Sequence, residues 1–184
     1  MESSTINAGS GSGNLTSLRR IMIGNGVLMI FMTAVGGVGL WMYILGGFEI
    51  VPGYMVHFQL PGTEGGWQRA HTGPAMNGIM VMAVAFALPM VQMSFKLARR
   101  IGWVVMLDGW ANVGFYFFGN FSPNRGLAFG NSDIGPSNIF SILALGPAYL
   151  FGVLLMIALA ILGWKAIFPG QLSDESGSSL VSAE

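Results

Sequence analysis

A run of 25 residues without a charged side chain extends from Ile21 to Leu45, with the sequence IMIGNGVLMIFMTAVGGVGLWMYIL. At a rise of 1.5 Å per residue, an α-helix of this length measures about 37 Å, which exceeds the roughly 30 Å hydrocarbon core of a bilayer. Three further apolar runs follow, and Asp108 is the only charge within them. We therefore expect an all-α membrane protein with four transmembrane helices, at about residues 21–45, 71–95, 101–121 and 137–164.

The composition of the whole chain agrees with this class. Of its 184 residues, 53% are hydrophobic and 9% are charged, whereas soluble domains carry about 25% charged residues. Eight basic and eight acidic side chains leave no net charge, which argues against a nucleic-acid partner. The chain has no Cys, so thiolate metal sites, iron–sulfur clusters and a Cys nucleophile are excluded.

The two ends of the chain differ from the apolar middle. Residues 1–17 and 170–184 are rich in Ser and Gly and show no apolar period. Such segments bury too little apolar surface to fold, so we expect disordered extensions on both sides of a four-helix domain at 18–169.

The basic residues predict the orientation. Six of the eight lie near the two ends or in the short connection between the second and third helices, and only Arg69 and Arg125 lie in the other two connections. Because cytoplasmic loops are enriched in Lys and Arg, we expect both termini in the cytoplasm. The connections at about 46–70 and 122–136 are then long outer loops, which can roof a site.

A polar stripe is expected on the third helix. Asp108, Asn112 and Tyr116 follow one another at intervals of four residues, which places them on one helix face. Tyr116 lies about 7–8 Å and Asn77 about 9 Å below the outer surface, so the two share a depth and are expected to line a cavity. The structural alternatives are a hydrogen-bond anchor for Asp108 and an interfacial aromatic role for Tyr116.

His71 and His57 are the only histidines. His71 belongs to RAHTGPAMNG, where Thr72 can cap a helix with Pro74 in its early turn, so His71 is expected at the outer mouth above Asn77. Either imidazole can ligate a metal or haem iron, or can simply be a hydrogen-bonded packing residue. Spacing alone establishes no metal site.

A family resemblance rests on four long strings. They are GGFEIVPGYMVHFQLPG, WQRAHTGPAMNG, LDGWANVGFYFFGNFSPNRGL and GPAYLFGVL. They resemble the styrene oxide isomerases over about residues 22–164. The resemblance implies a multi-pass enzyme of the bacterial cytoplasmic membrane, surrounded by lipid, that forms a homotrimer and converts styrene oxide, an aryl epoxide, to phenylacetaldehyde. A ridge of small residues in the fourth helix, Ala144, Ala148 and Gly152, suits close helix packing within or between chains.

The same resemblance implies a cofactor and site residues. It implies a ferric haem b with His71 as the axial ligand of the iron, Asn77 and Tyr116 as catalytic residues, and Asp108 as their support. The implied reaction is Lewis-acid opening of the epoxide at its benzylic carbon, followed by a 1,2-hydride shift.

Two other classes remain open at this stage. A b-type haem electron-transfer subunit would usually place two His on facing helices at matched depth, and a small carrier using the Asp108 stripe would bind no chromophore.

Overall fold

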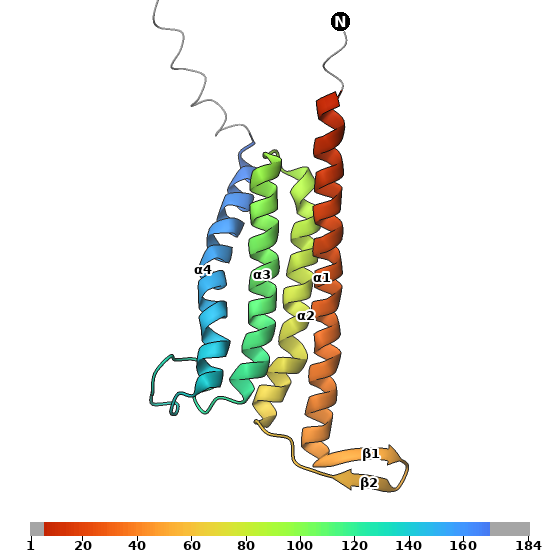
Figure 1. Cartoon of the computed structure of the whole chain (residues 1–184), viewed down its shortest axis with the longest axis vertical. Coiled ribbons are helices and arrows are strands. Elements are labelled where there is room, and N and C mark those ends of the chain that lie inside the picture. Colours follow the sequence, from red (N-terminus) through yellow and green to blue (C-terminus); the bar gives the residue numbers. More distant parts are fainter. Residues whose placement is uncertain (1–5, 170–184) are drawn as a thin grey trace, which may run out of the picture.

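Four long helices form the bundle in the computed structural model, which describes residues 6–169 (Figure 1). They are α1 (Ile6–Leu45), α2 (Glu64–Ala87), α3 (Phe95–Asn120) and α4 (Ile139–Ile167). All four are long and apolar enough to cross a membrane, which confirms that part of the prediction. The shorter elements are a 3₁₀ turn, η1 (Leu88–Met90), and a hairpin of β1 (Gly47–Val51) and β2 (Tyr54–His57).

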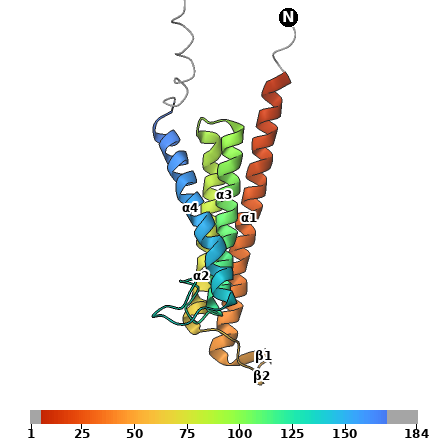
Figure 2. The same cartoon turned by 60° about the vertical axis from the view of Figure 1, so that its left-hand side comes forward.

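The helices pack mainly against their neighbours in the chain. Figure 1 places α2 and α3 between α1 and α4, and Figure 2 shows α4 running obliquely to α3. The N-terminal end of α1 and the C-terminal end of α4 lie at the same end of the bundle as the α2–α3 connection (Figure 1). We call the opposite end, which carries β1 and β2, the hairpin end. The core between the helices includes the fully buried side chains of Met22, Met29, Val81, Ile101 and Val105.

Helix α1 begins 15 residues earlier than expected, at Ile6 rather than Ile21. The expectation of disorder over 1–17 is therefore corrected for residues 6–17. Leu18, three residues before the apolar run, is buried and lies with Met22 against Gly102 of α3, so the packing of α1 on the bundle begins before that run. Residues 1–5 and the tail at 170–184 lie outside the described residues.

Helix α2 also begins earlier, at Glu64 rather than at residue 71. Its N-cap is Thr63, whose side-chain oxygen accepts a hydrogen bond from the Gly66 N–H at 3.0 Å. The Thr72 hydroxyl, which we expected to form the cap, donates to the Gln68 carbonyl within the helix. His71 therefore lies about two turns inside α2, and its expected place at the start of the helix is wrong.

Proline and capping residues set the other helix ends. Helix α2 ends at Ala87 instead of residue 95 because Pro89 falls in the 3₁₀ turn that follows. Helix α3 begins at Phe95 instead of 101, with Ser94 as its N-cap. Lys96, Arg99 and Arg100 thus belong to the first turns of α3 and not to the connection before it.

The connection after α1 is an ordered antiparallel hairpin. Gly53 in its turn has φ +84°, a conformation that glycine adopts without strain, and its N–H donates to the Glu49 carboxylate at 2.7 Å. His57 is exposed at the end of β2 and pairs with Gly47. This hairpin forms much of the first half of the long connection that the sequence predicted at about residues 46–70.

Close backbone approach joins α1 to α2. A Cβ on Gly36 would collide with the Ala70 carbonyl, which Pro74 leaves without its usual intrahelical donor. A Cβ on Gly26 would lie 2.8 Å from the Gly78 carbonyl oxygen. The small ridge of α4 also packs inside the chain, because Ala144 is buried against Gly126 and Gly152 faces Asp108.

Candidate functional site

Tyr116 and Asn77 come together around Gly73. The Tyr116 ring of α3 lies so close to the Gly73 backbone of α2 that a Cβ at this position would collide with it. Asn77, one turn further along α2, is 8% exposed, and its Nδ2 donates to the Gly73 carbonyl at 3.3 Å. The two side chains that were expected to share a depth therefore contact the same glycine.

Asp108 and Asn112 form the buried part of the stripe on α3. Asp108 is fully buried, and its Oδ2 accepts a hydrogen bond from Asn112 Nδ2 at 2.9 Å. Its Oδ1 has no hydrogen-bond partner among residues 6–169 and faces Gly152 of α4. The carboxyl group thus links neighbouring turns of α3 and retains one oxygen for a further donor.

His71 is oriented by helix α1. Its Nδ1 lies 3.0 Å from the Thr33 carbonyl oxygen, and Gly37 makes room for the ring. Because a carbonyl only accepts hydrogen bonds, Nδ1 carries the proton and Nε2 keeps a free lone pair. Metal-ligating histidines commonly donate their other ring N–H to such a carbonyl.

The described residues contain no cluster of three or more His, Asp or Glu side chains that could hold a metal ion. His71 therefore suits a metal whose other ligands come with the cofactor, as the four nitrogens of a haem do. One imidazole with a free Nε2 fits a cofactor of that kind.

His71 and Tyr116 lie on different sides of α2. Two residues along an α-helix correspond to a rotation of about 200°. His71 accordingly faces α1, whereas Gly73 faces Tyr116 of α3. His71 therefore lies nearer to the hairpin end of α2 than Asn77 does, but its ring faces α1, and His57 lies apart from both in the exposed hairpin.

Sequence reasoning missed a polar link between α1 and α3. Trp110 Nε1 donates to Asn25 Oδ1 at 2.8 Å, and Asn25 Nδ2 donates to the Ile21 carbonyl. The available signal was an Asn inside a charge-free run, because a buried amide requires partners. The link joins the helix that carries Asp108 to the helix that orients His71.

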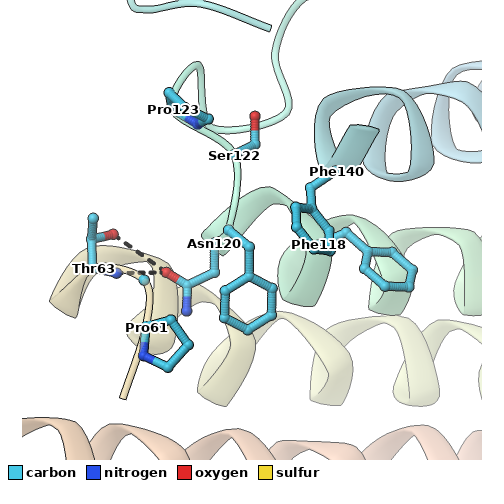
Figure 3. Close-up of a pocket in the computed structure, with 9 residues that line it drawn as sticks. Pro61, Thr63, Phe118, Asn120, Ser122, Pro123 and Phe140 are labelled. Atoms are coloured by element: carbon cyan, nitrogen blue, oxygen red, sulfur yellow. Dashed lines mark hydrogen bonds between the residues drawn. The ribbon is translucent and has the colours of Figure 1, made fainter. Parts of the chain in front are cut away.

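Sequence reasoning also missed a cavity of about 560 Å³ at the hairpin end (Figure 3). It lies beyond Tyr116, at the end of α3, and none of the four predicted site residues lines it. Its lining includes Asn120, Phe118 and Phe121 of the string FYFFGNFSP. That string contributed to the family resemblance without suggesting a pocket beyond Tyr116.

Comparisons with known proteins identify the family of the chain. A family model described as styrene oxide isomerase matches residues 18–167, which include most of α1 and all of α2, α3 and α4. A styrene-oxide isomerase of Pseudomonas fluorescens is 60% identical over 153 residues, which are 83% of this chain and 90% of that protein. The chain therefore belongs to the styrene oxide isomerase family and is an isomerase with four helices suited to spanning a membrane.

Proposed function

We propose that the protein converts styrene oxide to phenylacetaldehyde. The observation that carries the proposal is the 60% identity to a styrene-oxide isomerase over most of the chain. The fold supports it, because Tyr116 and Asn77 both contact Gly73. Substrate and product are isomers at the same overall oxidation level, so the reaction consumes no electron donor.

The residues around Gly73 suit the opening of an epoxide. Breaking the benzylic C–O bond places positive charge on carbon and negative charge on oxygen, and a 1,2-hydride shift then yields the aldehyde. The Tyr116 hydroxyl and the second N–H of Asn77 Nδ2 can donate to that oxygen, while the Tyr116 ring face can stabilise the cationic carbon. Burial of the site, where Asn77 is 8% exposed, would exclude the water that otherwise traps the cation as a diol.

His71 is the residue that would hold a haem b in this proposal, through Nε2. Support comes from the Nδ1 contact with the Thr33 carbonyl, which leaves Nε2 with its lone pair. A ferric haem, when bound, supplies a Lewis acid toward an epoxide oxygen. Asp108 would support the polar stripe through Asn112, without contacting the substrate.

We also propose that the protein works as a homotrimer in the bacterial cytoplasmic membrane, with both termini in the cytoplasm. Large apolar side chains are exposed on α1 and α4, including Phe31 at 60% and Met156 at 65%. Lipid or further copies of the chain would cover such surfaces.

An electron-transfer subunit is less well supported. Within the described residues the second histidine, His57, lies in an exposed hairpin rather than on a helix facing His71.

The test is an absorption spectrum of detergent-purified protein, oxidised and reduced, with and without styrene oxide, together with an assay for phenylacetaldehyde. We expect a Soret band that responds to substrate, and aldehyde without added cofactor. His71→Ala should lose the band and the activity together, whereas His57→Ala, the matched histidine control, should keep both. Tyr116→Phe should keep the band and lower turnover.

Three results would count against the proposal. Absence of a Soret band in haem-replete protein would remove the haem, and full activity of Tyr116→Phe would remove its hydroxyl from the chemistry. An enzyme that makes no aldehyde from styrene oxide would contradict the proposed substrate.

A further inference from the structure

The cavity at the hairpin end has the size of a small-molecule site. Its volume is about 560 Å³, within the range of about 300–1,000 Å³ typical of ligand pockets. The segment before α2, the end of α3, the turn that follows it and the first turn of α4 all contribute to its wall (Figure 3). Segments far apart in the sequence therefore border one open pocket.

The walls of this cavity are aromatic and uncharged. Phe118 stacks on Phe140 with ring centroids 6.4 Å apart, and Phe121 meets Phe140 edge-on at 5.7 Å. None of the nine lining residues is charged. These walls suit a neutral aromatic ligand, because aromatic pairs gain energy in such offset and edge-on arrangements.

Asn120, which lines the cavity, has one buried hydrogen-bond donor without a partner among the described residues. Its side chain is 5% exposed, and its Oδ1 accepts from the Thr63 N–H at 2.8 Å (Figure 3). The Thr63 N–H can only donate, so the amide oxygen must face Thr63. Asn120 Nδ2 then has no acceptor in the described part of the chain. A buried N–H left without an acceptor costs about 1–3 kcal/mol, which a ligand oxygen would recover.

We propose that this cavity binds neutral aryl compounds that carry one acceptor oxygen, with the ring among the phenylalanines and the oxygen on Asn120 Nδ2. The aryl epoxide and its aldehyde product both fit this description, and naming them as the natural ligands rests on the proposed function. Asn120 lies four residues after Tyr116 on α3, about 6 Å along the helix axis. The cavity is thus a binding site through which substrate reaches, or product leaves, the region of Tyr116 and Asn77.

Trp67 provides a built-in reporter for the test. Its ring meets Phe121 edge-on at 6.1 Å, and its Nε1 donates to the carbonyl of Pro61, which lines the cavity. The probe is 4-bromoacetophenone, a ketone that cannot undergo epoxide opening and whose bromine quenches tryptophan fluorescence. The matched probe, 1-bromo-4-ethylbenzene, has a similar shape and no oxygen.

We expect the ketone to quench the tryptophan fluorescence of the detergent-purified protein in a saturable way. In Trp67→Phe the saturable component of this quenching should be lost. The ketone should bind three- to tenfold, that is about 0.6–1.4 kcal/mol, more tightly than the hydrocarbon. Asn120→Asp keeps an oxygen for the Thr63 N–H but removes the donor, so it should abolish this preference. The same variant should raise KM for styrene oxide by a similar factor and leave kcat within about twofold.

Asn131→Asp is the matched control, because Asn131 also accepts from a backbone N–H, that of Ser137, but lies outside the cavity wall. It should leave the ketone preference and KM unchanged. A purely structural role for Asn120 would lower kcat and thermal stability in Asn120→Asp without changing the preference between the two probes.

The site is disproved if saturable quenching does not depend on Trp67, or if Asn120→Asp retains the preference for the ketone. Failure of the proposed function would give a result distinct from failure of this binding site. In that case the protein would make no aldehyde from styrene oxide while the probes still bound at Trp67.

Discussion

Tyr116 and His71 are each positioned by a glycine of the neighbouring helix. Tyr116 of α3 lies on Gly73 of α2, and His71 of α2 lies on Gly37 of α1. In both pairs a Cβ would occupy space that the ring fills, so the missing side chain sets the ring's position. At the scale of single residues, two glycines thus define the candidate site as much as the polar groups do.

We predict that Gly73→Ala lowers kcat/KM by about 10- to 100-fold, because the added methyl group displaces the Tyr116 ring and small misplacements are costly in catalysis. Steady-state kinetics with styrene oxide measures this effect. The Soret band that we propose to depend on His71 should remain, since His71 faces α1. Gly114→Ala is the control, because its nearest neighbour there, Phe118, lies at an ordinary 3.7 Å. Unchanged turnover in Gly73→Ala would show that the ring position is not critical.

The α1–α2 interface depends on backbone contact. Gly36→Ala would force α1 away from the Ala70 carbonyl, so we predict a loss of about 1–3 kcal/mol of unfolding free energy from overpacking. Gly24→Ala on the same helix is the control, since its added Cβ would meet nothing within 4 Å. Unfolding of detergent-solubilised protein, followed by circular dichroism, provides the measurement. Equal stability of the two variants would contradict close packing at Gly36.

The end of α2 depends on a side chain from α1. Pro89 has no N–H to donate to the Ala85 carbonyl, and Arg19 Nε donates to that carbonyl at 3.0 Å instead. We predict that Arg19→Met lowers the unfolding free energy by about 1–3 kcal/mol, because the carbonyl is left unpaired. Arg20→Met, at the exposed neighbouring residue, should have little effect.

A double-mutant cycle with Pro89→Ala isolates this contact. Residue 89 would then offer an N–H to the Ala85 carbonyl, so Arg19→Met should cost less in that background. The same cost in both backgrounds would show that Arg19 acts in another way.

The absence of Cys makes the orientation of the whole molecule directly testable. Asp133 lies in the connection between α3 and α4 at the hairpin end, and Gln92 lies in the connection between α2 and α3 at the other end; both are exposed. We predict that a membrane-impermeant maleimide labels Asp133→Cys in cells with an intact inner membrane. Gln92→Cys should react only after the membrane is permeabilised. The reverse pattern would overturn the proposed topology.

Local chemistry in the sequence was enough to predict four helices that are long and apolar enough to span a membrane. It also predicted that Tyr116 and Asn77 lie near each other, and both contact Gly73. Hydropathy, charge and helical periodicity are properties of short segments, and they need no knowledge of distant contacts. The long strings that resemble the styrene oxide isomerases likewise led to the family, which the comparisons show.

The remaining features depend on contacts between segments distant in the sequence. Leu18 and Met22 of α1 pack against Gly102 of α3, and Gly36 of α1 approaches α2 beside Pro74. The orientation of His71 toward Thr33 and the cavity beside Asn120 likewise require helices placed next to each other. No local pattern encodes these pairings, because tertiary packing selects which faces of the helices meet.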